Sequence, residues 1–456
     1  MTRRNLFSRA VSHTLILGAV LVAAPLGKKP LGAQPLTVAD DGARPISLAE
    51  AIQMAQRNSP AVVQARGLER TAGAARRAAL GAYMPSLNLN GSSSRTQGVQ
   101  FFQGQLVPLT GNPWNYNNGL GTQLELFDGG RRWQELARVR ATGDVADATT
   151  IQARFDAALQ VKQQYYAALA ARESESAARA QLEQAEQQLK ASTARVAAGV
   201  ATKSDSLRSA IQLGNAQLAV LTSQNDLRVA NAALTRVVGS TTTVTTSPSD
   251  SAESMPTVPL EPELETLISR GPAVQLAEAN LLAARASRKA QRSQYLPTLS
   301  MSYNYSYTQS SKAFTSGNLF LLGGNDPNRQ NMSFNFSYPL FNGFVREQGA
   351  VQADVTLRNA EAQLRDARLG ARQTLTSQLR ALANAQARVQ VQLAAIAAAE
   401  EDLRVQQQRY ALGASTLLDL LTSQTQLNQA RQALIQARLD GRIARAQLSS
   451  LVGRDL

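Results

Sequence analysis

The chain has 456 residues, a formal net charge of +14, no cysteine and a single histidine, His13. Hydrophobic residues make up 44% of the sequence and aromatic residues only 5%, which favours long helices packed through small side chains over a thick globular core. The missing cysteines exclude disulfides and thiol nucleophiles, and a chain that lost its first 33 residues would hold no imidazole for acid–base catalysis or a usual zinc site.

Residues 1–33 are predicted to be a secretory signal peptide. Three arginines in the first nine residues precede an apolar stretch, residues 15–26, and Ala33 provides a small residue before a cut at Gln34. The apolar stretch is too short to span the ~30 Å core of a bilayer, and no later segment approaches a spanning helix. The sequence therefore predicts an exported protein without a helical membrane anchor.

Two helices and two strands are expected next. A capping-box pattern from Ser47 to Glu50 begins a short helix, and Pro60 begins a longer one. The hydrophobic period then changes to two residues, which predicts strands at about 85–94 and 117–127. A long, polar, Gly-rich loop is expected between the two strands.

A very long helix is predicted after the second strand. From residue 131 to about residue 198 there is no proline and a single glycine, so a continuous helix would reach ~100 Å and would be a coiled-coil-like element. A turn at about 195–207 and a helix at about 203–238 complete this half. Residues 240–262 are rich in Ser, Thr and Pro and are predicted to be a linker without a core of its own.

The same pattern then occurs a second time. Residues 34–239 and 263–456 are predicted to be two copies of a unit that runs helix, helix, strand, strand, long helix, helix. The second copy has strands at about 297–308 and 330–341 and a turn at about 409–421. The turns of both copies keep Arg, Gly, Thr and Asp in matching places, 214 residues apart, so each is expected to form the tip of a helical hairpin. A plain turn between helices would explain one copy, and its recurrence in a whole-chain repeat weakens that explanation.

The strands alternate apolar or aromatic residues with small polar ones, most clearly from Leu299 to Tyr307 and from Met332 to Tyr338. A soluble sheet that buries one face and a set of lipid-facing strands both fit this alternation. The signal peptide and the near-absence of an opposing apolar element favour lipid. Because four strands cannot close a barrel, the chain would have to oligomerise, and two copies would give eight strands while three would give twelve.

Together these features resemble the TolC-type outer membrane efflux proteins over nearly all of the chain that follows the signal. The motifs in question are the Tyr-x-Pro strand openings at Tyr83 and Tyr295, the Phe-[Asp/Asn]-Gly turns at Phe127 and Phe341, and Arg-x3-Gly-x5-Asp-x-Leu at both tips. The resemblance implies an α+β membrane protein: a homotrimer whose 12-stranded transmembrane β-barrel lies in the outer membrane and continues into a long periplasmic α-helical barrel. It also implies a passive duct without a cofactor, joined to a periplasmic adaptor and to an inner-membrane pump or ABC exporter, for tripartite efflux or type I secretion.

The resemblance further assigns roles to residues of the periplasmic tips. Tyr410, its hydrogen-bond partner Asp205 in the neighbouring hairpin, and a ring of Asp419 near the pore mouth are the expected gate. The expected adaptor-docking positions are Arg195, Gly199, Thr202, Arg409, Gly413 and Thr416. Two positions depart from the family pattern, because Ser415 replaces an Arg that links the tips and Thr422 replaces a second Asp. For Asp205 and Asp419, charge compensation at a helix N-terminus is the alternative.

An exported periplasmic coiled-coil scaffold without a pore is the alternative function, but it leaves the alternating aromatic strands unexplained. Enzymatic activity is not indicated, because the acidic residues are spread along helical faces and form no constellation; no metal site is expected either. The positive charges are scattered singly and form no Lys/Arg block, which argues against nucleic acid binding. No motif indicates the transported substrate.

Overall fold

A computed structural model describes residues 43–95, 98–108, 114–247, 261–310 and 328–455. These residues belong to one compact unit, Gly42–Leu456. The predicted signal peptide, residues 1–33, and part of the predicted linker, residues 248–260, lie outside the described residues. None of the described helices combines the length and the apolar run that a membrane-spanning helix needs.

The described chain begins with strand β1 (Arg44–Ile46) and helices α1 (Leu48–Asn58) and α2 (Pro60–Gly81). Ser47 caps α1 as predicted, since its hydroxyl accepts a hydrogen bond from the Glu50 amide at 3.3 Å. The predicted capping box is only half formed, however, because the Glu50 carboxylate pairs with Arg44 at 2.7 Å.

A four-stranded antiparallel sheet has the order β2 (Ser86–Ser94), β5 (Asn115–Phe127), β7 (Thr298–Ser310) and β8 (Asn328–Ser337). The central pair, β5 and β7, joins the two halves of the sequence. Strand β8 ends before the predicted residue 341, because Pro339 has no amide to donate to a ladder. Strand β5 begins two residues before the predicted 117.

The predicted loop between the first two strands contains a small hairpin of its own. Strands β3 (Val99–Phe102) and β4 (Gln105–Pro108) pair through a two-residue turn at Gln103 and Gly104. Both turn residues have positive φ, 49° and 80°, which is the backbone that a tight hairpin turn of this kind requires.

Two helices of 67 residues dominate the structure: α3 (Arg131–Ala197) and α7 (Val345–Ala411). The first confirms the very long helix expected from residue 131, and each measures about 100 Å at 1.5 Å per residue. Shorter helices α4 (Lys203–Val238), α5 (Glu261–Ile268), α6 (Pro272–Arg292) and α8 (Leu417–Val452) complete the set, with a 3₁₀ turn, η2 (Ser293–Tyr295), before β7.

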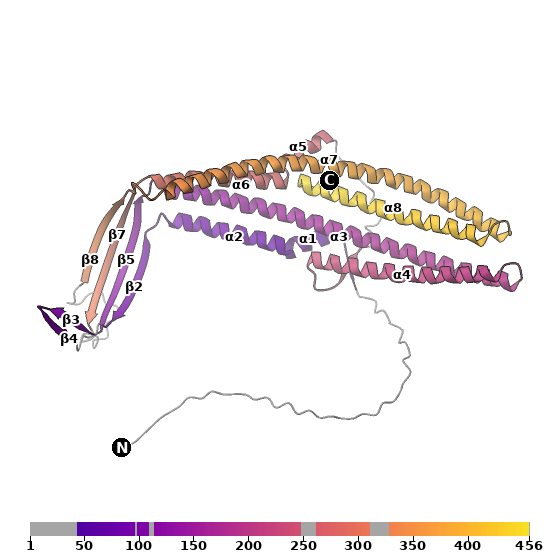
Figure 1. The fold of residues 1–456 in the computed structure, drawn as a ribbon, viewed down its shortest axis with the longest axis horizontal. Coiled ribbons are helices and arrows are strands. Elements are labelled where there is room, and N and C mark those ends of the chain that lie inside the picture. The colour runs from indigo at the N-terminus through magenta and orange to yellow at the C-terminus, as the bar shows by residue number, and fades with distance from the viewer. Residues whose placement is uncertain (1–42, 96–97, 109–113, 248–260, 311–327, 456) are drawn as a thin grey trace, which may run out of the picture. The chain divides into compact units, whose positions relative to one another are not determined.

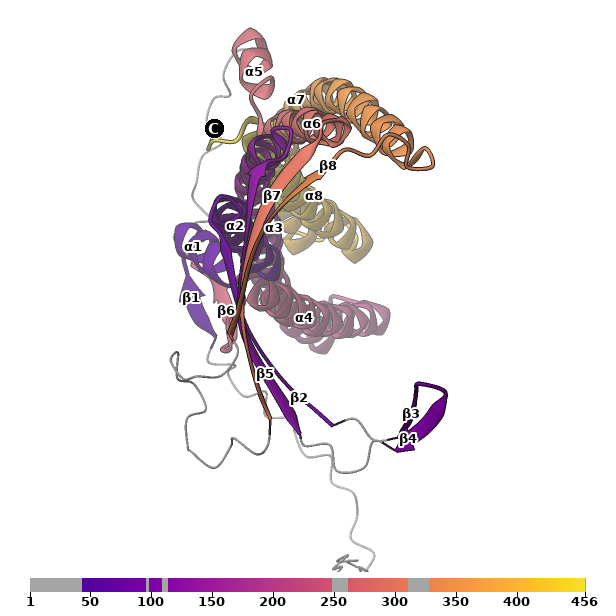
Figure 2. The ribbon, with the colours of Figure 1, turned by 90° about the vertical axis from the view of Figure 1, so that its left-hand side faces the viewer.

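The long helices pack in rows rather than around one central core. Helix α4 packs on α3, α3 on α8, and α8 on α7; nearer the sheet the row is α2, α3, α6 and α7. Viewed from the sheet end, α4 and α7 lie far apart, with α3 and α8 between them (Figure 2). In Figure 1 the sheet lies at one end of these helices, and the α3–α4 and α7–α8 turns lie together at the other.

A compact apolar cluster forms midway along the helices. Strand β6 (Val244–Thr246) pairs in parallel with β1, and Val244 and Ile46 pack against Tyr165 of α3. The buried Tyr165 hydroxyl donates a hydrogen bond to the Ile46 carbonyl at 3.0 Å. Strand β6 therefore gives order to part of the predicted linker 240–262, because its one apolar residue joins a core that other elements supply.

Candidate functional site at the helical tips

Both helical hairpins end in the same backbone turn. In the first tip (residues 195–207), Gly199 has φ 73°, its amide donates to the Val196 carbonyl, and the Val200 amide donates to the Arg195 carbonyl. In the second tip (residues 409–421), Gly413 has φ 75° and the equivalent amides donate to Tyr410 and Arg409. This is the Schellman motif, which places glycine where a side chain would strain the backbone.

A complete capping box starts the outgoing helix of each tip. The Thr202 hydroxyl accepts from the Asp205 amide at 3.3 Å, while Asp205 Oδ2 accepts from the Thr202 amide at 3.1 Å and from its hydroxyl at 2.9 Å. Thr416 and Asp419 make the same three contacts at 3.2, 3.0 and 2.7 Å. Both aspartates therefore satisfy helix-end amides, as the charge-compensation alternative requires. This capping role does not exclude a part in the gate, which stays a prediction.

One contact joins the two tips. Arg195 Nη1 donates a hydrogen bond to the Tyr410 carbonyl at 2.7 Å, and the guanidinium lies 4.5 Å from the centroid of the Tyr410 ring. The repeat-related Arg409 makes no such bridge; its Nη2 reaches the Ala414 carbonyl of its own turn at 3.4 Å. The family resemblance assigns both arginines to docking, which stays a prediction; in the structure Arg195 also holds one hairpin to the other.

The Tyr410 hydroxyl is buried and has no hydrogen-bond partner among the described residues. Burial raises the pKa of this hydroxyl, the Arg195 charge opposes the rise, and the Asp205 charge adds to it. Asp205 is thus close enough to influence Tyr410, but the hydrogen bond implied by the family resemblance is not formed within one protomer. The predicted bond between Tyr410 and Asp205 of a neighbouring hairpin stays a prediction.

Three further positions of the second tip are Asp419, Ser415 and Thr422. Asp419 is exposed, and hydrogen bonds from the Thr416 hydroxyl and amide lower its pKa. Ser415, at the place of the family's linking arginine, has a buried hydroxyl without a partner, while the Thr422 hydroxyl donates to the Leu418 carbonyl of its own helix. Neither Ser415 nor Thr422 supplies an ionic contact among the described residues, whereas Arg195 contacts the other hairpin at the tip.

Exposed apolar side chains flank both turns. Leu412 is 84% exposed and Val200 is 66% exposed, and Leu207 and Leu418 also face solvent at the start of the outgoing helices. Sequence reasoning chose the polar and glycine positions of the tips and missed these four residues. The sequence did indicate two of them, because Val200 and Leu412 lie inside the turns, where an apolar residue has no partner on its own helix.

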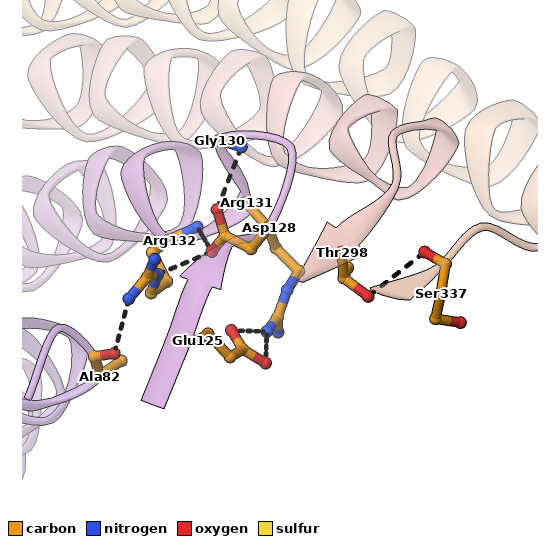
Figure 3. A network of polar contacts seen from close by, with 8 residues as sticks. All are labelled: Ala82, Glu125, Asp128, Gly130, Arg131, Arg132, Thr298 and Ser337. Atoms are coloured by element: carbon orange, nitrogen blue, oxygen red, sulfur yellow. Dashed lines mark hydrogen bonds and ion pairs between the residues drawn. The ribbon is translucent and has the colours of Figure 1, made fainter. Parts of the chain in front are cut away.

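The strand-to-helix junctions position the helices that lead to the tips. In the first copy, Asp128 is 5% exposed and accepts hydrogen bonds from the Gly130 amide, the Arg132 amide and Arg132 Nε, so it caps α3 (Figure 3). Arg132 also lies 5.0 Å from the Tyr83 ring centroid and reaches the Ala82 carbonyl. Nearby, Arg131 binds both oxygens of Glu125.

The second junction keeps the arginine but not the carboxylate. Arg346 lies 5.0 Å from the Tyr295 ring centroid and donates to the Pro339 and Leu340 carbonyls. Asn342 stands where the first copy has Asp128, and its Oδ1 atom and Arg346 Nε are both buried without partners. The first junction is therefore the better satisfied of the two.

The described residues contain no group of three or more His, Cys, Asp or Glu side chains placed to hold a metal ion. The tip aspartates each pair with a threonine of their own turn, and ion pairs such as Glu135–Arg138, Glu401–Arg404 and Glu400–Arg431 join single acids to single bases.

Comparison with known proteins agrees with this geometry. Residues 51–240 and 264–454 both match the family described as "Outer membrane efflux protein". CyaE of Bordetella pertussis is 28% identical over 395 residues, which cover 85% of this chain and 80% of CyaE. TolC of Salmonella enteritidis is 26% identical over 166 residues, covering 35% of this chain and 34% of TolC.

A solved structure of CusC, described in terms of folding and transmembrane channel formation, superposes with a TM-score of 0.75 at 19% identity, covering 90% of this chain and 92% of CusC. At that identity the likeness shows the fold alone, and it confirms a TolC-like arrangement of helices and strands. With matches in both halves of its sequence, the chain belongs to the outer membrane efflux protein family, whose members are channels rather than enzymes.

Proposed function

We propose that this protein is the outer membrane duct of a tripartite efflux or type I secretion system, a passive homotrimer that opens at its periplasmic helix tips. The observation that carries the proposal is the four-stranded sheet, which has one continuous apolar face and whose outer strands, β2 and β8, each have one edge without a neighbour among the described strands. Family membership supports the location, and the names of related proteins, a "transmembrane channel" among them, support the pore.

The two faces of the sheet differ sharply in chemistry. Residues directly opposite one another on antiparallel strands share a face, and the register therefore groups the apolar side chains of all four strands: Leu87, Leu89, Leu120, Leu124, Leu299, Met301, Tyr303, Tyr305, Met332, Phe334 and Phe336. The other face carries small polar residues, such as Ser302 and Ser333, whose hydroxyls lie 2.7 Å apart. The strands of this sheet pack extensively only on one another, so no described helix covers the apolar face. Lipid against the apolar face and water against the polar face would suit the chemistry of both faces.

The two edge strands of the sheet must pair with strands of another copy of the chain. Strands β2 and β8 each have one neighbour in the four-stranded sheet, and unpaired backbone groups are not tolerated within a bilayer. Pairing β2 of one copy with β8 of the next closes the edges, and three copies would supply twelve strands. The rows of helices end at α7 on one side and, on the other, at α2 near the sheet and at α4 near the tips; they would likewise continue into those of neighbouring copies to form a tube.

The tips are proposed to serve as gate and docking site. Three Asp419 carboxylates around one axis would attract cations and repel one another, and Tyr410 would complete its missing hydrogen bond with Asp205 of a neighbouring copy. The exposed turn residues Leu412 and Val200, together with the predicted docking positions, would contact a periplasmic adaptor protein that leads to an inner-membrane pump or ABC exporter.

For the chain as a whole, we infer that residues 1–33 are removed on export and that residues 34–239 and 263–456 are two repeats joined by residues 240–262. The two family matches, one in each half, support this division.

The mass of the protein purified from envelope membranes tests the proposal. A detergent-dependent species with three times the mass of the protomer is expected. A species that leaves the envelope without detergent would instead favour a periplasmic scaffold that buries its aromatic strands against protein. A stable dimer would refute the twelve-stranded barrel.

A further inference from the structure

A groove of about 520 Å³ lies between helices α6 and α7, close to the sheet and far from the tips. Two residues of α6 and five of α7 line it: Arg288, Arg292, Ala350, Val351, Asp354, Val355 and Arg358. Its lining therefore combines three guanidinium groups, one carboxylate and a strip of small apolar side chains.

The charges in this groove are not balanced. Asp354 is shared by two arginines, with Oδ1 3.0 Å from Arg288 and Oδ2 3.1 Å from Arg358. The Arg292 guanidinium has neither an ion pair nor a hydrogen bond to any of the described residues. The groove thus carries a formal excess of two positive charges, and its guanidinium forks match the geometry of phosphate oxygens.

The position of the groove is as informative as its charge. Arg292 is the last residue of α6, and strand β7 begins at Thr298. On α7, Arg358 is 13 residues after the first residue, Val345, or about 20 Å along the helix. The groove therefore begins directly where the sheet ends, at the depth where a membrane-inserted sheet would meet lipid headgroups.

An exposed apolar segment connects the sheet to this region. Between the end of β8 and the start of α7, five large apolar side chains face solvent: Tyr338, Leu340, Phe341, Phe344 and Val345. Aromatic residues of this kind gather at membrane interfaces. On the groove itself, Val351 and Val355 are exposed beside the arginines. Exposed apolar side chains thus occur both in the segment that leads from the sheet and in the cationic groove, which is the combination an anionic amphiphile would fit.

We propose that the α6–α7 groove binds the phosphate-bearing headgroup of an anionic membrane lipid of the phosphatidylglycerol class. Arg292 supplies the unpaired cation, and Arg288 and Arg358, which Asp354 bridges, line the same groove. The acyl chains lie along the apolar segment toward the sheet. The inference rests on the proposed insertion of the sheet in the outer membrane, and it adds a specific lipid site that anchors the helices at the membrane surface.

The test measures lipid retained by the purified oligomer in detergent micelles doped with phosphatidylglycerol. Arg292→Gln is the informative variant, because Arg292 has no described partner to lose; Arg380→Gln is the matched control, an exposed arginine of α7 about 33 Å beyond Arg358. We expect Arg292→Gln to lower phosphatidylglycerol retention about tenfold, as loss of a charge-assisted contact implies, and Arg380→Gln to leave it unchanged. Arg358→Gln, with the same expectation, keeps the test decisive if Arg292→Gln does not assemble.

Equal retention by the wild-type protein and by Arg292→Gln would overturn the inference, as would equal retention of zwitterionic phosphatidylcholine and phosphatidylglycerol. Complete displacement by millimolar inorganic phosphate would identify a free-anion site and also overturn it. Lipid retention and channel conductance are measured in separate experiments. If the oligomer conducts but shows no selective retention of phosphatidylglycerol, only this inference is refuted. A lipid-binding oligomer without channel activity refutes the proposed function instead.

Discussion

The contact between Arg195 and Tyr410 gives the sharpest prediction for the tips. Arg195→Ala removes a 2.7 Å hydrogen bond from a cation to the Tyr410 carbonyl and a guanidinium that lies 4.5 Å from the ring centroid. The same substitution at Arg409 removes only a 3.4 Å contact within one turn. The repeat therefore supplies its own matched control, with the same residue type in the same motif.

The expected size of the effect follows from these two contacts. A hydrogen bond from a charged donor contributes about 1.5–3 kcal/mol, and a partly exposed cation–π contact adds about 0.5–1 kcal/mol. Because Arg195 is only partly buried, we take about 2 kcal/mol for the pair, which shifts the balance between joined and separated tips about 30-fold.

The assay is the open probability of single channels in planar bilayers. We expect the open probability to rise about 30-fold for each protomer that carries Arg195→Ala, and to rise less than about threefold with Arg409→Ala. Tyr410→Phe keeps both the ring and the carbonyl, so it should leave the Arg195 contact intact. The reasoning is refuted if Arg195→Ala opens no more than wild type, or if Arg409→Ala has an equal effect.

Further predictions concern the second junction and the second tip. Asn342→Asp should raise the stability by about 1–2 kcal/mol, because a carboxylate could accept from the buried Arg346 Nε; a lower melting temperature in detergent would contradict this. Since hydrogen bonds from its own turn lower the pKa of Asp419, the stability gained from this capping box should be full at pH 7 and be lost as the pH falls through that lowered pKa. Amide exchange at residues 417–420, unchanged between pH 7 and pH 3 after correction for intrinsic rates, would argue against that capping role. Asp419→Ala should weaken channel block by multivalent cations, and undiminished block would place Asp419 away from the pore axis. Leu412→Asp should reduce adaptor capture about tenfold, whereas Leu369→Asp, also exposed but mid-helix, should not; capture unaffected by Leu412→Asp would exclude the second turn as a docking surface.

The long elements were predictable because local rules determine them. A stretch without proline after residue 131 was enough to predict α3, and the two-residue alternation around Tyr303 and Phe334 was enough to predict strands and to separate their two faces. The turns were predictable too, because Gly199 and Gly413 occupy positions with positive φ that other residues rarely adopt.

The contacts between repeats could not be predicted in this way. Arg195 and Arg409 occupy the same place in the same motif, yet only Arg195 bridges the tips, because the bridge depends on which residue of the other hairpin lies opposite. Strand β6 was missed because only one of its three residues, Val244, is apolar, and its partners come from distant parts of the chain. The β3–β4 hairpin was missed because Gln103-Gly104 is not one of the strong turn pairs.

The central claim is that the chain forms a gated pore, and the most direct test is the planar-bilayer conductance of the detergent-purified oligomer whose mass has been determined. A trimer that gives discrete, small, cation-selective openings is the predicted result. A trimer that inserts into the bilayer and gives no openings with either wild type or Arg195→Ala would contradict the account.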